Sequence, residues 1–215
     1  VLGLGTGRGV QWRLCVLLTE SLCRRPWREV AAAAIAGGAD CLQIREPDES
    51  DGSLLRRAAE ARRLIDASAA PRPALIVNNR VDVALLCGAD GVHLGTGDLP
   101  IDAARRLCGD RLLIGASTHD LAEARAAIDS GADYCGVGAM FNTTTKPRAA
   151  SGVVYLRDYI GAYGHVPHLA IGGITPHNIA LLRSAGVRGV AVSSAVCGAE
   201  DPAQICREII AAVSG

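Results

Sequence analysis

The sequence repeats one short motif at nearly regular intervals. Gly-Ala-Asp occurs at residues 38–40, 88–90 and 131–133, and a looser copy, Gly-Val-Arg, follows at residues 186–188. Each copy ends a helix-like stretch and opens a short apolar run. Glycine readily takes the left-handed conformation that follows a helix, and a short, continuously apolar run is typical of a buried strand. The motif therefore predicts a chain that alternates helices and strands.

Strand-like runs also occur midway between the repeats, which makes eight strand–helix units. Because the runs are continuously apolar, we expect parallel strands covered by helices. Eight units in 215 residues fit a single (β/α)8 TIM barrel over residues 1–215, with residues 1–13 as an N-terminal extension. An open doubly wound sheet is the alternative, but no Gly-x-Gly-x-x-Gly follows the first run. The predicted strands are 14–19, 41–45, 74–78, 91–94, 112–116, 134–138, 168–171 and 189–193, and the clearest helices are 53–67, 120–130 and 201–213.

Composition excludes several classes of protein. Basic and acidic residues both number 22, so the formal net charge is zero, which argues against nucleic-acid binding. No run approaches the roughly 20 apolar residues of a membrane-spanning helix, and the first 13 residues lack a signal-peptide pattern. Eight cysteines without a Cys-x-x-Cys pair suit buried, reduced thiols. We therefore expect a cytoplasmic protein that binds neither nucleic acid nor membrane, with the homo-oligomer and the monomer both left open.

Polar residues follow the second and third predicted strands, at the end of a TIM barrel where functional residues lie. Gln43 and Arg45 alternate onto the inner face of their strand. The planar guanidinium of Arg45 suits a carboxylate or a phosphate, although an internal ion pair with Glu46 would also satisfy it. Asn78 and Asn79 can hydrogen-bond a ligand, or cap the helix that follows.

The fourth and fifth strands bring an acid, two imidazoles and a hydroxyl to the same end. Asp98 lies in a glycine-containing turn, and a carboxylate among phosphate-binding residues is typical of a Mg²⁺ site. His93 is expected to be a hydrogen-bonded core residue, because no second His or Cys lies at zinc spacing. Ser117 offers a free hydroxyl, and Asp120 is expected to cap a helix. A Ser-His-Asp triad through His119 is disfavoured, since neighbouring residues do not easily reach triad geometry.

The segment after the sixth strand is the most informative. Lys146 is the only lysine in the chain, and three threonines precede it. Hydroxyls and one cation in a loop can surround an anion. Gly173 follows the seventh strand and Ser193 and Ser194 follow the eighth, at the usual phosphate site of TIM barrels. We therefore expect a phosphate monoester by the last two strands, and a second anion between Arg45, the lysine and a Mg²⁺ ion.

Several of these segments together resemble the thiamine phosphate synthase family, also called thiamine-phosphate pyrophosphorylase. The resemblance runs from about Leu14 to the C-terminus. It implies a (β/α)8 transferase that joins hydroxymethylpyrimidine diphosphate to hydroxyethylthiazole phosphate and releases pyrophosphate. The segments that carry it are Leu42–Glu46, Asn78–Ala84, Gly88–Gly95, Ser117–His119, Thr143–Lys146 and Ile171–Ile174.

The resemblance also implies residue roles, with Arg45, Ser117 and Lys146 as the catalytic set. In the reaction so implied, pyrophosphate leaves, and a pyrimidine-methyl cation is trapped by the thiazole nitrogen. The implied diphosphate ligands are Gln43, Arg45, Asn78, Ser117 and Lys146, the Mg²⁺ ligands are Asn79 and Asp98, and the thiazole phosphate ligands are Thr143, Thr144, Thr145, Gly173, Ser193 and Ser194.

The departures of the chain from the family pattern all fall in the diphosphate half, and the thiazole-phosphate half is nearly intact. Asn79 stands where the family usually has Asp, and Pro47, Thr96 and Val16 replace the usual Lys, Gln and Tyr. A neutral amide weakens Mg²⁺ binding relative to a carboxylate, although its carbonyl oxygen can still coordinate the ion.

Two main alternatives to the synthase stay open, beside an unrelated barrel isomerase. One is a thiazole tautomerase-like isomerase with His119 as acid and base. The other is a non-catalytic protein that binds thiamine phosphate or its precursors. Lys146 and its threonines favour the synthase, because a tautomerase needs no ligands for a diphosphate.

Replacing Lys146 by alanine is expected to lower the turnover number by at least about tenfold, because a charged hydrogen bond to the departing diphosphate is lost. Single-turnover rates of the wild type and of Lys146→Ala measure the effect. An unchanged rate removes the lysine from the mechanism.

Overall fold

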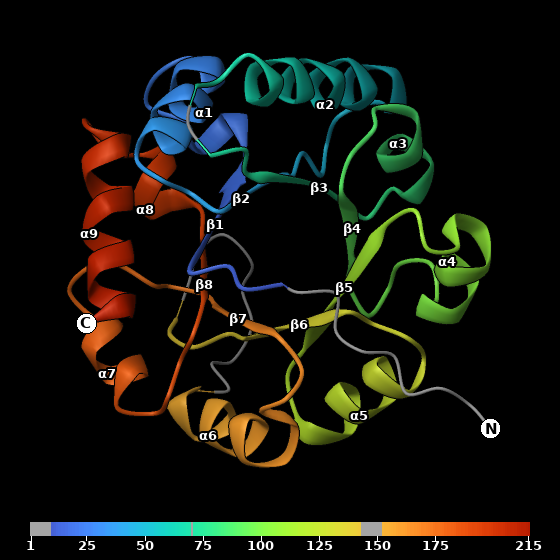
Figure 1. Cartoon of the computed structure of the whole chain (residues 1–215), viewed down its shortest axis with the longest axis vertical. Helices are drawn as coiled ribbons and strands as arrows, with labels where there is room; N and C mark the ends of the chain where they lie inside the picture. Colours follow the sequence, from blue (N-terminus) through green and yellow to red (C-terminus); the bar gives the residue numbers. More distant parts are fainter. Residues whose placement is uncertain (1–9, 70, 143–151) are drawn as a thin grey trace.

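The computed structural model describes residues 10–69, 71–142 and 152–215. Within them, eight parallel strands form a closed barrel in sequence order, with β8 paired to β1 and helices around the outside (Figure 1). The predicted (β/α)8 barrel is confirmed. The strands are β1 (Leu14–Leu18), β2 (Cys41–Ile44), β3 (Ala74–Asn78), β4 (Gly91–Leu94), β5 (Leu113–Thr118), β6 (Tyr134–Gly138), β7 (His168–Ile171) and β8 (Val190–Val192).

The helices cover the outer face of the barrel between successive strands. Residues 1–9 of the predicted N-terminal extension lie outside the described residues. No helix in the described part of the chain is long and apolar enough to cross a membrane. The helices are η1 (Glu20–Leu22), α1 (Trp27–Ala36), α2 (Asp51–Asp66), α3 (Val81–Leu86), α4 (Ile101–Cys108), α5 (Leu121–Asp129), α6 (Gly152–Tyr163), α7 (Ile179–Arg183), α8 (Ser194–Cys197) and α9 (Pro202–Ser214).

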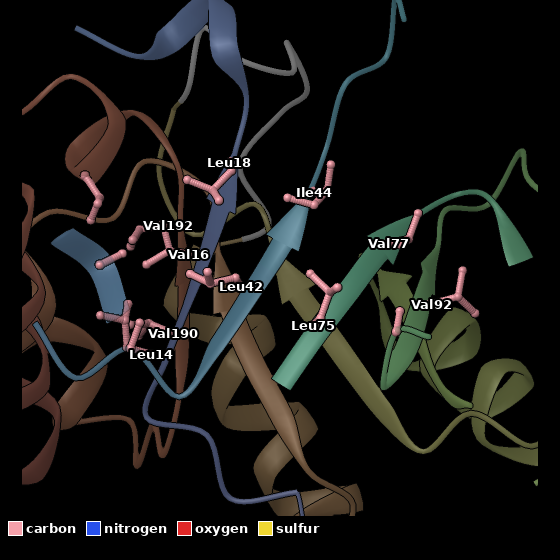
Figure 2. Packing of buried hydrophobic residues seen from close by; sticks show 14 of the residues in the cluster. Leu14, Val16, Leu18, Leu42, Ile44, Leu75, Val77, Val92, Val190 and Val192 are labelled. Atoms are coloured by element: carbon pink, nitrogen blue, oxygen red, sulfur yellow. The ribbon is translucent and has the colours of Figure 1, made fainter. Parts of the chain in front are cut away.

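Alternation along the strands divides the buried residues into two cores. The larger core lies between barrel and helices, and Figure 2 shows Val16, Leu42 and Leu75 of three neighbouring strands in it. The smaller core fills the barrel and includes Leu17, Ile76 and Tyr134. Aromatic residues make up only 3% of the chain, yet a tyrosine is among the largest fully buried side chains inside the barrel.

The cysteines behave as the sequence predicts. All eight are free thiols, seven of them buried and Cys23 only partly buried. Cys15 and Cys41 face one another across β1 and β2 inside the barrel, with their sulfurs 3.2 Å apart. These two thiols thus serve as small apolar side chains that fit the narrow barrel interior.

The Gly-Ala-Asp motifs end helices as predicted. Gly38, Gly88 and Gly131 have φ values of 87°, 67° and 98°, in the left-handed region that favours glycine. The backbone N–H of the following alanine donates to a carbonyl five residues earlier, as Ala39 does to Ala34 and Ala132 does to Ala127, each at 3.0 Å. This is the Schellman arrangement, and it turns the chain from the helix into the next strand.

The aspartates of the motifs join neighbouring strands. Each carboxylate accepts a hydrogen bond from a backbone N–H at the start of the preceding strand, and each also forms an ion pair with an arginine. These contacts lie at the amino ends of the strands, opposite the end where function is expected. The backbone donors are Leu14 to Asp40 (3.1 Å), Leu75 to Asp90 (2.8 Å) and Ile114 to Asp133 (2.7 Å), and the paired arginines are Arg13, Arg62 and Arg105.

Replacing Asp133 by alanine is expected to lower the free energy of unfolding by about 2–3 kcal/mol, because the N–H of Ile114 and the guanidinium of Arg105 lose a shared charged acceptor. Urea denaturation measures the change. The matched control is Asp129→Ala. Asp129 is exposed, and within the described residues its one ion pair is with Arg125 on its own helix, so its loss should cost under about 0.5 kcal/mol. Equal losses in the two variants would contradict the role assigned to the motif.

Candidate functional site

Two adjoining hollows open at the carboxyl ends of the strands. The polar pocket, of about 320 Å³, holds the predicted diphosphate and metal residues that the structure describes. The glycine pocket, of about 130 Å³, lies toward β7 and β8. Arg45 and Ser117 line both, so the two hollows form one continuous site. The polar pocket includes Gln43, Arg45, Asn78, Asn79, His93, Asp98 and Ser117, and the glycine pocket includes His119, Gly172, Gly173, Ser193 and Ser194.

Strand alternation places the polar side chains. Gln43 pairs in register with Leu17 and Ile76 of the barrel interior, and only 3% of it is exposed. Asn78 lies in register with His93 on the next strand. Since alternate residues of a strand share a face, these side chains point into the barrel, as predicted for Gln43.

Arg45 forms no ion pair within the described part of the chain, so the alternative of an Arg45–Glu46 pair is wrong. Glu46 instead contacts Arg57 of α2 at 3.0 Å and accepts a hydrogen bond from the N–H of Glu20. Burial raises the pKa of Glu46, while the Glu20 N–H and the Arg57 charge lower it. The carbonyl oxygen of Arg45 accepts a hydrogen bond from the Thr19 hydroxyl, which fixes its backbone. The guanidinium therefore remains available to an anion.

Asn79 has a φ of 66°, and its backbone N–H donates to the carbonyl of His93 at 2.8 Å. Asparagine tolerates this left-handed conformation better than most residues. Helix α3 begins after Arg80, which makes no side-chain cap, so the alternative that an asparagine caps this helix is wrong. The turn holds the Asn79 side chain at the rim of the polar pocket.

Asp98 closes the turn after β4. One carboxylate oxygen accepts a hydrogen bond from the N–H of Gly95 at 2.6 Å, and Asp98 lines the polar pocket, as Asn79 does. The described residues contain no cluster of three or more His, Cys, Asp or Glu side chains suited to a metal. Mg²⁺ commonly takes one or two carboxylates together with substrate phosphates. One carboxylate and one amide therefore fit a Mg²⁺ ion whose remaining ligands come from substrate and water.

His93 is confirmed as a hydrogen-bonded core residue. Its Nε2 lies 3.0 Å from the Ser117 hydroxyl, and its Nδ1 lies 3.2 Å from the hydroxyl of Tyr134. Ser117 belongs to β5, which runs to Thr118, so the predicted end of this strand at residue 116 is wrong. The sequence analysis missed Tyr134. The available signal was Gly136, two residues after the tyrosine. Glycine inside a strand often marks a place where another group approaches the backbone closely.

His119 belongs to a separate arrangement. Its Nδ1 lies 2.6 Å from a carboxylate oxygen of Glu123, and it lines the glycine pocket. Asp120 caps α5 by accepting a hydrogen bond from the N–H of Glu123, as predicted. Ser117 contacts His93 rather than His119, so the disfavoured triad is not formed among these residues.

The glycine pocket has tightly packed backbone walls. Gly172 and Gly173 have φ values of 103° and 64°, and a Cβ on Gly173 would lie 2.7 Å from the carbonyl oxygen of Asn142. The Ser193 hydroxyl donates to the carbonyl of Leu17 at 2.9 Å, which ties β8 to β1. Ser194 starts α8 and is exposed. The predicted ligands Thr143, Thr144, Thr145 and Lys146 lie outside the described residues.

A barrel with one continuous site at the carboxyl ends of its strands belongs to the class of (β/α)8 proteins that act on small molecules. The model of the family described as thiamine monophosphate synthase matches residues 14–196. The chain is 46% identical over 211 residues to the thiamine-phosphate synthase of Chloroflexus aurantiacus, across 95% of this chain and 94% of that protein. The chain belongs to the thiamine monophosphate synthase family, and the resemblance inferred from its motifs is confirmed.

Two further similarities agree with this family. The chain is 42% identical over 202 residues to the thiamine-phosphate synthase of a Synechococcus species, across 92% of this chain but only 56% of that longer protein. The solved thiamine phosphate pyrophosphorylase of Pyrococcus furiosus superposes with a TM-score of 0.83 at 35% identity, across 94% of this chain and 97% of that one. The enzyme class predicted from the sequence, a transferase of the thiamine-phosphate synthase type, is confirmed by these relatives.

Replacing Gly173 by alanine is expected to lower the free energy of unfolding by about 1–3 kcal/mol, because a left-handed alanine is strained and its Cβ overlaps the Asn142 carbonyl. It should also weaken binding of hydroxyethylthiazole phosphate. Urea denaturation and calorimetric titration measure the two effects. The control is Gly161→Ala in α6, where a Cβ would meet open space and alanine should be neutral or stabilising by up to about 1 kcal/mol. The same loss in both variants would contradict this account of the pocket.

Proposed function

We propose that this chain condenses hydroxymethylpyrimidine diphosphate with hydroxyethylthiazole phosphate to give thiamine phosphate and pyrophosphate. The observation that carries the proposal is the polar pocket. Gln43, Arg45, Asn78 and Ser117 come from three different strands or their ends and face one cavity, and Arg45 has no carboxylate partner within the described residues. Such a set of donors around an unpaired guanidinium suits a diphosphate.

The residues of the pocket would act mainly by position and charge. Arg45 neutralises the departing pyrophosphate, while Gln43, Asn78 and Ser117 donate hydrogen bonds that fix its orientation. Charge that develops on the leaving group is then met by donors already in place. The glycine pocket would bind the phosphate of the thiazole, because it adjoins the polar pocket and has a backbone that a ligand can approach closely. Two bound substrates held in this way react as one assembly.

We also propose that Mg²⁺ assists, held by Asp98 and Asn79. The ion would supply positive charge that stabilises the leaving diphosphate. Asp98 has one carboxylate oxygen engaged by Gly95, which holds the side chain in place. Asn79 would offer only its neutral carbonyl oxygen, so we expect weaker Mg²⁺ binding than two carboxylates would give.

The tautomerase-like isomerase is a second candidate function, favoured by one observation. His119 lines the glycine pocket and its Nδ1 contacts Glu123 at 2.6 Å. A carboxylate that orients an imidazole supports acid–base chemistry. Conversion of a thiazole phosphate tautomer without any need for the pyrimidine diphosphate would favour this candidate over the synthase.

The cytoplasmic location also remains a proposal. It is supported by the eight free thiols, because reduced cysteines are typical of reducing compartments. Small phosphorylated molecules are the proposed partners of the site.

A single-turnover assay with both substrates and a Mg²⁺ titration tests the function. We expect thiamine phosphate to form, with a rate that saturates in Mg²⁺. Absence of product at millimolar Mg²⁺, with thiazole phosphate still bound, would contradict the synthase and lead to the tautomerase assay.

The variant Asn79→Asp tests the metal site. It is expected to lower the Mg²⁺ concentration at half-maximal rate by about three- to tenfold, because a carboxylate replaces an amide ligand. The charge-matched control is Asn142→Asp, since Asn142 does not line the polar pocket. If the Mg²⁺ dependence of Asn79→Asp stays at the wild-type value, position 79 does not contact the ion.

A further inference from the structure

A line of three polar side chains crosses the inside of the barrel below the polar pocket. The hydroxyl of Tyr134 on β6 lies 3.2 Å from Nδ1 of His93 on β4, and Nε2 of His93 lies 3.0 Å from the hydroxyl of Ser117 on β5. Tyr134 is fully buried, His93 is 8% exposed, and Ser117 opens to the pocket. The line therefore runs from the closed interior to the site.

Two strand glycines make room for this line. A Cβ on Gly115 would lie 2.1 Å from Cζ of Tyr134 and 2.6 Å from Nδ1 of His93, and a Cβ on Gly136 would lie 3.1 Å from Cε1 of His93. No side chain with a Cβ fits at residue 115 while both rings keep these positions. The two glycines thus leave space for the tyrosine–histidine pair. An interior filled by aliphatic residues would not need glycine at these positions.

The partners of Tyr134 fix the direction of its hydrogen bond. Within the described residues, its hydroxyl has one hydrogen-bond partner, Nδ1 of His93, and Trp12 packs against its ring edge-on. Burial raises the pKa of Tyr134 well above its ordinary value, so the hydroxyl keeps its proton. A buried O–H without an acceptor is costly, so Tyr134 donates to Nδ1. In a neutral imidazole the proton then lies on Nε2.

The proton on Nε2 of His93 determines which way the hydrogen bond to Ser117 runs. Nε2–H donates to the Ser117 oxygen, which leaves the proton of the serine hydroxyl to point elsewhere. Ser117 lines the polar pocket together with Arg45, so its hydroxyl can donate to an anion there. With the opposite tautomer, His93 would accept that proton, and Ser117 would present only lone pairs to the anion, which repel it.

We propose that Tyr134 and His93 are positioning residues that hold Ser117 as a hydrogen-bond donor to the departing diphosphate. The proposal rests on the proposed function, because it assigns the anion in the polar pocket to the pyrimidine diphosphate. His93 also lines the polar pocket, but its two ring nitrogens contact Tyr134 and Ser117, so in this scheme both residues act through the serine.

The variant Tyr134→Phe removes the first donor and leaves the ring in place. We expect the turnover number to fall about tenfold and the affinity for Mg²⁺–pyrophosphate to weaken, with the KM for thiazole phosphate unchanged. The matched control is Tyr155→Phe, because the Tyr155 hydroxyl is also buried and donates to the neighbouring Thr118 at 2.7 Å. Tyr155→Phe is expected to cost stability but to leave the affinity for Mg²⁺–pyrophosphate unchanged, since Thr118 does not line the polar pocket. Equal turnover numbers for wild type and Tyr134→Phe would overturn the proposal.

A double-mutant cycle separates positioning from structure. In the Ser117→Ala background, Tyr134→Phe should cause no further loss of turnover, because the serine through which it acts is absent. Additive losses would overturn the proposal. His93→Gln, which keeps an N–H donor, should retain more turnover than His93→Leu. Equal losses of turnover in these two variants would also overturn the proposal.

Pyrophosphate binding distinguishes failure of this inference from failure of the proposed function. If the wild type forms no thiamine phosphate, the proposed function fails, and calorimetric titration with Mg²⁺–pyrophosphate still tests the donor line. Weaker binding of Mg²⁺–pyrophosphate by Tyr134→Phe but not by Tyr155→Phe then supports the positioning role of Tyr134. Equal binding by the two variants overturns that role.

Discussion

The carboxylates of the Gly-Ala-Asp motifs join neighbouring strands at their amino ends, and the rest of the structure depends on these hydrogen bonds. In one unit of three residues, glycine ends a helix and aspartate accepts the N–H of the neighbouring strand, as Asp133 does for Ile114. A bond to an ionised acceptor is among the stronger hydrogen bonds in proteins. Because these contacts fix the strands at one end, the residues at the other end are free to serve a ligand, as in other TIM barrels.

In the last unit of the repeat the side-chain acceptor lies on the preceding strand instead of in the motif. Arg188 stands where the other copies have aspartate. Its backbone N–H donates to Nε2 of His168 on β7 at 3.4 Å, and its guanidinium reaches the carbonyl of Gly164. Burial lowers the pKa of His168 to about 4, with the charge of Arg188 acting in the same direction. The imidazole therefore stays neutral near pH 7 and can accept.

The sequence predicted most of the fold because apolar runs and glycine motifs are local signals. The predicted bounds of β3, β4, β6 and β7 agree with the structure. The predicted end of β5 at residue 116 was wrong, because Ser117 and Thr118 are polar and do not continue the apolar run. Both lie in the strand, where the Ser117 hydroxyl contacts His93 and the Thr118 hydroxyl donates to the carbonyl of Gly136 and accepts from Tyr155. The Tyr134–His93–Ser117 line could not be predicted, because its members lie on three strands and meet only once the register is known.

Strand alternation also explains why Arg45 forms no ion pair within the described residues, although the chain has as many acids as bases. Arg45 and Glu46 are neighbours in sequence, yet their side chains leave the backbone on opposite sides. Outside the barrel mouth, Glu20, Glu46 and Glu49 all contact Arg57, whose guanidinium also lies over the ring of Trp27. These carboxylates thus contact the outer arginine, and within the described residues none of them pairs with Arg45. A partly buried cation without a partner is unfavourable, so an anionic ligand removes a cost that the folded chain would otherwise carry.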